Sequence, residues 1–226
     1  MKNKYVIIVA GGVGSRMESK LPKQFIEVNG KPIIFHTIEK FHQAIEEINI
    51  ILVLHPDYID YYKELVSNHN FNIPCTIANG GVTRYHSSLN GIELVCDDSI
   101  VAIHDAARPL ISAKHIQDLF DAAEVSEFVV PVVDVKESLR LIDDSSSNVV
   151  NRSKYKVVQT PQVFRSELLK ESYSKGYKNL YTDDASVVQT ESGRTPTLII
   201  GEEQNIKITT PVDIVIAQYI LGEEKN

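Results

Sequence analysis

The stretch Val6-Ile7-Ile8-Val9-Ala10-Gly11-Gly12-Val13-Gly14-Ser15-Arg16-Met17, followed by Leu21-Pro22-Lys23-Gln24-Phe25, decides how the rest of the chain is interpreted. Aliphatic, mostly β-branched residues followed by small ones predict a buried strand that runs into a loop. The glycines leave backbone N–H groups open to a negatively charged ligand, and Arg16 and Lys23 add two positive charges beside the loop. The stretch therefore predicts a phosphate-binding site after the first strand.

The glycine loop matches neither of the two common nucleotide-binding fingerprints. Met17 stands where a dinucleotide-binding loop has its third glycine, and no acidic residue ends a second strand about 20 positions later. No Gly-Lys-Ser/Thr follows, so the loop is not a Walker A motif. A simple strand-ending turn is the alternative. Residues 1–31 hold six basic residues against two acidic ones, which favours the phosphate site.

Length and composition predict a single α/β enzyme domain over residues 1–226. The chain is 43% hydrophobic and 23% charged, which is ordinary for a soluble globular protein. Its net charge of −7 and the lack of a basic stripe argue against nucleic-acid binding. The N-terminal apolar run is too short for a signal peptide, and no run approaches the ~20 residues of a membrane span. We therefore expect a cytoplasmic protein with no membrane partner.

Strand and helix patterns alternate to the end of the chain. Strands are expected at 6–9, 50–54, 75–78, 100–103, 128–133 and 197–200, and helices at 32–45, 57–67, 87–96, 113–123, 166–175, 183–192 and from 211 onward. The alternation predicts a Rossmann-like, doubly wound, mostly parallel sheet. Thr182 is expected to cap the helix over 183–192. The looser pattern over 134–158, around a polar turn, predicts a projecting β-hairpin arm.

Ligands of such sheets bind at the carboxyl ends of the strands, where residues 10–17, 80–84 and 104–108 are expected to converge. Gly80-Gly81 is a second glycine turn that opens a helix, and its backbone could read the edge of a base. The alternative is a connecting loop capped by Thr83 or Ser87, with Arg84 as a surface charge.

Asp105 is the strongest single candidate for a metal ligand. A lone carboxylate after a strand can hold Mg²⁺ while phosphate oxygens and water complete the coordination. The alternative is a local ion pair with Arg108. His104 is more consistent with a hydrogen-bonded core residue than with a ligand. The histidines and cysteines lack zinc spacing, and no Gly-x-Ser-x-Gly motif is present.

These parts together fit nucleotidyl transfer. The glycine loop, Arg16 and Lys23 would hold a nucleoside triphosphate, and Asp105 would place the metal. A phosphate-bearing acceptor would attack the α-phosphorus and expel pyrophosphate. Because a phosphomonoester is largely dianionic near neutral pH, no general base is required, and catalysis would depend on positioning and charge stabilisation.

The chain resembles the 2-C-methyl-D-erythritol 4-phosphate cytidylyltransferases of the non-mevalonate isoprenoid pathway. The resemblance extends from Tyr5 to the last helix and rests on ordered motifs. They are Ala10-Gly11-Gly12-Val13-Gly14-Ser15-Arg16-Met17, Pro22-Lys23-Gln24-Phe25, Gly80-Gly81-x-x-Arg84-x-x-Ser87, His104-Asp105-Ala106-Ala107-Arg108-Pro109, Gln159-Thr160-Pro161-Gln162-Val163-Phe164, Thr182-Asp183-Asp184-Ala185-Ser186 and Asn205-Ile206-Lys207-Ile208-Thr209-Thr210-Pro211.

The resemblance implies a role for each matching residue. Catalysis would involve Arg16, Lys23, Arg152 and Lys207. CTP would bind Ala10, Gly11, Gly12, Gly14, Gly81, Arg84, Ser87 and Ala106. The acceptor would bind Arg108, Ser138, Arg152, Thr160, Thr182 and Lys207. Asp105 would serve Mg²⁺, or another divalent cation. The arm over 134–158 would join a homodimer and bring Arg152 into the partner's site.

Two other enzyme activities and a catalytically silent nucleotide-binding module remain as alternatives. Ala10-Gly11-Gly12 is also common in the sister ribitol 5-phosphate cytidylyltransferases, whereas Ala107 before Arg108 and the Thr182–Ser186 motif favour the erythritol enzymes. A dinucleotide-binding oxidoreductase would share the topology, but the loop lacks its third glycine and its ribose-binding acid.

Overall fold

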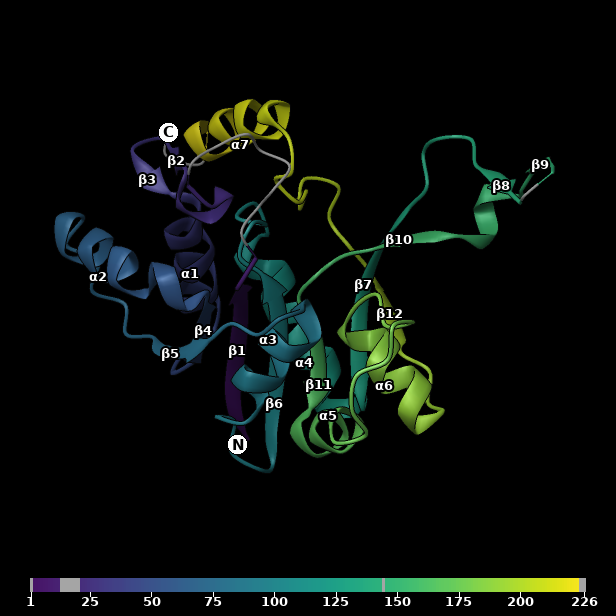
Figure 1. Ribbon diagram of the computed structural model, residues 1–226, viewed down its shortest axis with the longest axis horizontal. Helices are drawn as coiled ribbons and strands as arrows, with labels where there is room; N and C mark the ends of the chain where they lie inside the picture. Colours follow the sequence, from purple (N-terminus) through teal and green to yellow (C-terminus); the bar gives the residue numbers. More distant parts are fainter. Residues whose placement is uncertain (1, 13–20, 144, 224–226) are drawn as a thin grey trace.

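A computed structural model describes residues 2–12, 21–143 and 145–223, and its centre is an eight-stranded sheet (Figure 1). The strands of this sheet are β1 (Asn3–Ala10), β4 (Asn49–Leu54), β5 (Thr76–Asn79), β6 (Ser99–Asp105), β7 (Phe128–Asp134), β10 (Lys156–Val158), β11 (Gln162–Arg165) and β12 (Thr197–Ile200). They lie in the order β10-β7-β11-β6-β1-β4-β5, and β12 pairs with β7. β6, β1, β4 and β5 run parallel, as do β7 and β12, whereas β10 and β11 are antiparallel to their neighbours. The expected mostly parallel α/β sheet is confirmed.

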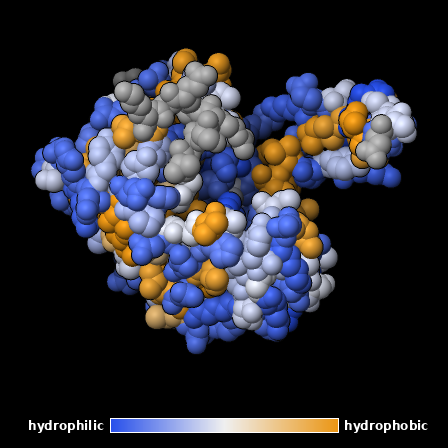
Figure 2. Space-filling model, viewed as in Figure 1, coloured by the Kyte–Doolittle hydropathy of each residue, from blue (hydrophilic) through white to orange (hydrophobic). Residues whose placement is uncertain are grey.

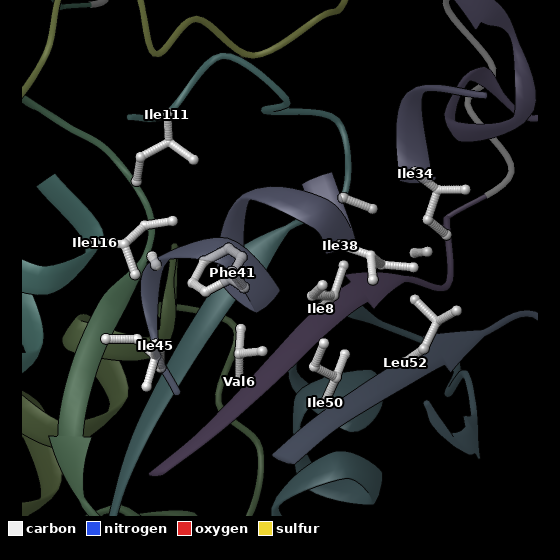
Figure 3. Close-up of a cluster of buried hydrophobic side chains, with 14 of the residues drawn as sticks. Val6, Ile8, Ile34, Ile38, Phe41, Ile45, Ile50, Leu52, Ile111 and Ile116 are labelled. Atoms are coloured by element: carbon white, nitrogen blue, oxygen red, sulfur yellow. The ribbon is translucent and has the colours of Figure 1, made fainter. Parts of the chain in front are cut away.

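Helices cover both faces of the sheet because successive side chains of each buried strand point to opposite sides. Val6 and Ile8 of β1 pack with α1 (Ile33–Ala44), α2 (Ile59–Asn68) and α4 (Ala113–Val125). Figure 3 shows the side chains of α1 lying over β1 and β4. Tyr5 and Ile7 pack on the other face with α3 (Arg84–Ile92), α5 (Ser166–Tyr173) and α6 (Asp184–Ser192). The two apolar layers fix the strand ends that carry the candidate site.

Two predicted helix starts are wrong, and side-chain capping explains both. The helix expected over 87–96 is α3, which begins at Arg84 because Thr83 Oγ1 accepts a hydrogen bond from the His86 N–H. The expected cap Thr182 is not the cap of α6. Asp183 takes that place, and it forms a reciprocal capping box with Ser186.

Strand β11 was not predicted. Its four residues include Gln162 and Arg165, so the segment lacks the apolar run that marks the other buried strands. It is held instead by pairing with β6 on one side and β7 on the other. A two-residue ladder of β2 (Glu27–Val28) and β3 (Lys31–Pro32) also escaped prediction, as did the short helices η1 (Lys23–Phe25) and η2 (Pro56–Tyr58).

The segment after β7 forms the projecting hairpin that the sequence predicts (Figure 1). β8 (Arg140–Ile142) pairs with β9 (Ser147–Val149), and η3 (Arg152–Lys154) leads back to β10. Leu141, Ile142 and Val149 are exposed on this arm, and Figure 2 shows hydrophobic surface along it.

The last part of the chain returns to the carboxyl end of β6. The Ile208 N–H donates to the carbonyl of Ala107 at 2.9 Å, and Ile208 joins a third apolar cluster with Ala217 and Leu221 of α7 (Pro211–Glu223). None of the helices in the described ranges has the length and apolar character needed to cross a bilayer.

Candidate active site

A cavity of about 460 Å³ opens at the carboxyl ends of β1 and β6. Ten of the predicted site residues line it: Ala10, Gly11, Gly12, Lys23, Gly81, Arg84, Ser87, Asp105, Ala106 and Lys207. The predicted convergence of three loops is therefore confirmed for their described residues. Gly14 and Arg16 lie outside the described residues.

The two glycine turns meet at the side chain of Ser87. Ser87 Oγ accepts a hydrogen bond of 3.0 Å from the Gly81 N–H. A Cβ atom on Gly11 would come within 2.7 Å of the same oxygen, so Gly11 allows the turns to approach closely. The meeting of the turns places backbone groups from two strand ends on one wall of the cavity.

The first turn of α3 packs so closely on Gly81 that no side chain fits at this position. A Cβ atom there would lie 2.4 Å from His86 Cβ and 2.8 Å from the His86 carbonyl carbon. Thr83 caps the helix, and Arg84 and Ser87 then fall on its first turn, facing the cavity. A helix N-terminus beside the cavity favours an anionic ligand.

Gln24 is a cavity residue for which the sequence suggested no role. Its Nε2 donates to the carbonyl of Ala10 at 2.8 Å and to that of Gly12 at 3.3 Å. Gln24 therefore ties the glycine loop to η1, which carries Lys23. Thr83 and Thr209 also line the cavity. Gln24 and Thr209 are marked in the sequence only by their place within the quoted motifs, whereas Thr83 was also a candidate helix cap.

Asp105 is surrounded by three cations. Arg84 Nε lies 3.3 Å from Oδ1, while Arg108 Nε and Lys207 Nζ lie 3.4 Å and 2.9 Å from Oδ2. Burial alone would raise the pKa of this carboxyl, but Arg84, Lys207 and Arg108 together hold it well below its ordinary value. The local pair with Arg108, which was the alternative to a metal ligand, is present.

The donor set around Asp105 suits a metal that arrives with phosphate rather than a resident ion. Asp105 is the one carboxylate among the described residues lining the cavity, and both its oxygens face cations. No group of three or more potential ligands occurs in the described ranges. Mg²⁺ commonly takes one or two carboxylates, several waters and substrate phosphates, which this cavity can accommodate.

His104 is a core residue, as predicted. It is fully buried, with Nε2 3.1 Å from the carbonyl of Arg108 and Nδ1 3.1 Å from Thr160 Oγ1. Burial lowers its pKa to about 4, so the imidazole is neutral near pH 7. Thr160 Oγ1 also accepts from the Asp105 N–H at 3.1 Å. This pair fixes the backbone behind Asp105.

The remaining predicted acceptor residues are not all brought together within one chain. Arg108 contacts Asp105, and Thr160 supports it from behind. Thr182 is exposed just before α6, and Ser138 and Arg152 are exposed on the arm. Of the six predicted acceptor residues, Lys207 alone is among the described residues that line the cavity.

The family comparison covers almost the whole chain. Residues 4–223 match the family model described as 2-C-methyl-D-erythritol 4-phosphate cytidylyltransferase. The protein of that name from Bacteroides thetaiotaomicron is 46% identical over 216 residues, which are 96% of this chain and 98% of the relative. The one from Bacteroides fragilis is also 46% identical, covering 95% and 98% of the two chains.

Solved structures give the same result. The crystal structure of 4-diphosphocytidyl-2C-methyl-D-erythritol synthase from Anaerococcus prevotii aligns with a TM-score of 0.84 and 28% identity, covering 98% of this chain and 99% of the other. The 2-C-methyl-D-erythritol 4-phosphate cytidylyltransferase from Thermus thermophilus aligns with a TM-score of 0.75 and 29% identity, covering 97% and 98%. Because the family model matches residues 4–223, this chain belongs to the 2-C-methyl-D-erythritol 4-phosphate cytidylyltransferase family of nucleotidyltransferases.

Proposed function

We propose that this protein transfers the cytidylyl group of CTP to 2-C-methyl-D-erythritol 4-phosphate. The products are 4-diphosphocytidyl-2-C-methyl-D-erythritol and pyrophosphate, in isoprenoid precursor biosynthesis. The observation that carries the proposal is the joining of two glycine turns beside a cationic cluster, at the carboxyl end of a parallel sheet. Family membership supports the same reaction.

CTP binding is assigned to the wall of the cavity on which the turns meet. The proposed contacts are Ala10, Gly11, Gly12, Gly81, Arg84, Ser87 and Ala106, together with Gly14 beyond the described residues. Backbone N–H and C=O groups from the turns can read the edge of a base, and the N-terminus of α3 favours the anionic end of the ligand.

The chemistry is an in-line displacement at the α-phosphorus. An oxygen of the acceptor phosphate forms the new P–O bond, and the bond between the α- and β-phosphates breaks with its electron pair leaving on pyrophosphate. The dianionic acceptor needs no base, which agrees with a buried, neutral His104. Lys23 and Lys207, with Arg16 from outside the described residues, would stabilise the developing charge.

Mg²⁺, or another divalent cation, is proposed to enter with the triphosphate. Asp105 is the carboxylate that would hold it among the described residues of the cavity, and the metal would neutralise phosphate charge. Because both Asp105 oxygens contact cations, coordination requires that at least one of Arg84, Arg108 and Lys207 turn from the carboxylate to a phosphate.

The acceptor is assigned to Lys207, Arg108, Thr160 and Thr182, with Ser138 and Arg152 contributed by the arm of a second copy. Exposed apolar residues at the tip of the arm support a partner there, because exposed apolar surface commonly marks an interface. The proposed assembly is a homodimer in which each arm completes the other subunit's site.

A substrate pair provides the test. Pyrophosphate release from CTP and Mg²⁺ should occur with 2-C-methyl-D-erythritol 4-phosphate and be negligible with ribitol 5-phosphate at equal concentration. Release with ribitol 5-phosphate alone would assign the chain to the sister activity. Tight NADH binding without CTP affinity, measured by fluorescence titration, would favour an oxidoreductase instead.

A further inference from the structure

Asp183 and Asp184 are adjacent carboxylates at the start of α6 with different surroundings. Asp183 caps the helix, accepting from the Ser186 N–H at 2.8 Å and from Gln162 Nε2 at 2.7 Å. Asp184, the first residue of the helix, is fully buried. A buried carboxylate is costly unless it is paired, so the partners of Asp184 indicate what its charge does.

Three side chains from two other helices contact the Asp184 carboxylate. Ser88 Oγ and Tyr173 Oη donate to Oδ1 at 2.8 Å and 2.6 Å. Arg84 Nη1 lies 2.7 Å from Oδ2, although the contact lacks the alignment of a hydrogen bond. α3 and α5 thus hold Oδ1 in place, and Oδ2 is left to the guanidinium.

Arg84 is shared between two carboxylates. It contacts Asp184 behind the cavity, and its Nε lies 3.3 Å from Asp105 Oδ1 at the cavity wall. Burial alone would lower the pKa of Arg84, but Asp184 and Asp105 outweigh it and raise the pKa, so the guanidinium is always charged. No described residue accepts a hydrogen bond from the buried Arg84 Nη2. Arg84 lines the cavity, so its charged guanidinium, which has a donor to spare, is suited to an oxygen of the ligand.

We propose that Asp184 is a positioning residue for nucleotide binding, holding Arg84 against the pull of Asp105 so that the guanidinium donates to an oxygen of bound CTP. The inference rests on the proposed cytidylyltransferase function. If Asp184 loses its charge, Asp105 is the one charged carboxylate that still contacts Arg84 among the described residues, and the guanidinium turns toward Asp105. The guanidinium is then no longer pre-organised for the nucleotide, so CTP binding is weakened by the conformational entropy lost when the side chain is ordered.

The test compares two isosteric variants. Asp184→Asn is expected to raise the Kd for CTP, measured by isothermal titration calorimetry, by about tenfold, which is about 1.4 kcal/mol. The KM for CTP should rise with it, while kcat changes much less. Asp183→Asn is the matched control, since that side chain caps α6 without contacting Arg84, and its CTP affinity should equal that of the wild type.

An Arg84→Met background tests whether Asp184 acts through Arg84. There, Asp184→Asn should add little further loss of CTP affinity, because the group that Asp184 positions is absent. An equal loss in both backgrounds would overturn the proposal. Tyr173→Phe keeps the ring packing and removes one donor to Asp184, so a smaller rise in Kd, about threefold, is expected.

The outcomes separate this inference from the proposed function. A wild-type chain that binds no CTP would contradict both. Wild-type CTP affinity in a folded Asp184→Asn variant would overturn the positioning role alone. If that variant does not fold, as judged by thermal denaturation, wild-type CTP affinity in a folded Tyr173→Phe variant would overturn it instead.

Discussion

Lys23 Nζ donates a hydrogen bond of 2.8 Å to the carbonyl oxygen of Ile208, the residue that follows Lys207. The contact joins η1, near the start of the chain, to the segment that returns to β6 near its end. Lys207 Nζ in turn lies 2.9 Å from Asp105. Two lysines that are 184 positions apart therefore meet at one edge of the cavity, where a triphosphate would need positive charge.

Lys23→Ala is expected to lower kcat by about 10²–10³-fold, as does the loss of one pre-organised charge-stabilising donor elsewhere. KM for CTP should change much less if the ammonium acts mainly on charge that develops as pyrophosphate leaves. Steady-state pyrophosphate release measures both constants. Lys63→Ala, on the exposed surface of α2, is the matched control and should retain wild-type kinetics. Unchanged turnover in Lys23→Ala would contradict the catalytic assignment.

Gly81→Ala is expected to destabilise the fold, because its Cβ would lie 2.4 Å from His86 Cβ and 2.8 Å from a backbone carbon of α3. Overpacking of this kind costs about 1–3 kcal/mol, which lowers Tm by several degrees in a chain of this size. Differential scanning calorimetry measures the shift. Gly12→Ala is the control, since no described atom lies within 4 Å of its added Cβ, and it should stay within about 0.5 kcal/mol of wild type. Equal Tm values for the two variants would contradict the close approach.

Local patterns predicted the parts of the site that lie next to one another in the sequence. The first glycine loop, the second glycine turn and Asp105 each lie at the end of a strand. Each of these strands can be predicted from a short apolar run in the sequence. Ten of the predicted residues line one cavity, and one of them, Lys207, comes from the family resemblance and not from a strand end. The shared position of the strand-end residues follows from the rule that parallel strands present their carboxyl ends at one edge.

What the sequence left open depends on contacts between distant segments. The pairing of Asp105 with Lys207 joins residues 102 positions apart, so it could not be foreseen from spacing. Strand β11 is stabilised by its neighbours in the sheet and not by its own composition. Asp183 and Asp184 look equivalent in sequence, and only the packing of α3 and α5 against α6 distinguishes the helix cap from the buried carboxylate.

His104 should make stability depend on pH between about 6.5 and 4. Burial lowers the pKa of the folded-state imidazole to about 4, below the unfolded value near 6.5. Between these values the unfolded state binds a proton that the folded state does not, so the free energy of unfolding falls as pH falls. His104 changes the free energy of unfolding by at most about 1.4 kcal/mol per pH unit, which is the limit for a difference of one bound proton between the two states.

Urea denaturation at pH 7, 6 and 5 measures this dependence. His104→Gln removes the ionisable group and keeps polar atoms toward Thr160 and the carbonyl of Arg108, so its free energy of unfolding should fall less steeply with decreasing pH. His42→Gln, at an exposed position of α1, is the matched control and should follow the wild type. Parallel curves for wild type and His104→Gln would show that the imidazole is not held neutral by burial.

Arg152 provides the test of the arm, because it is exposed on η3 and does not line the cavity of its own chain among the described residues. If it completes the partner's site, Arg152→Ala and Lys23→Ala homodimers are each nearly inactive. In a mixed dimer, the site with intact Lys23 receives intact Arg152 from the other subunit, whereas the second site lacks both. Random mixing of equal amounts makes half the dimers mixed, so about a quarter of wild-type activity should return.

Differently tagged subunits and tandem purification verify that mixed dimers form. Their complete inactivity would mean that Arg152 serves its own subunit, and failure to form any dimer would contradict the role of the arm itself.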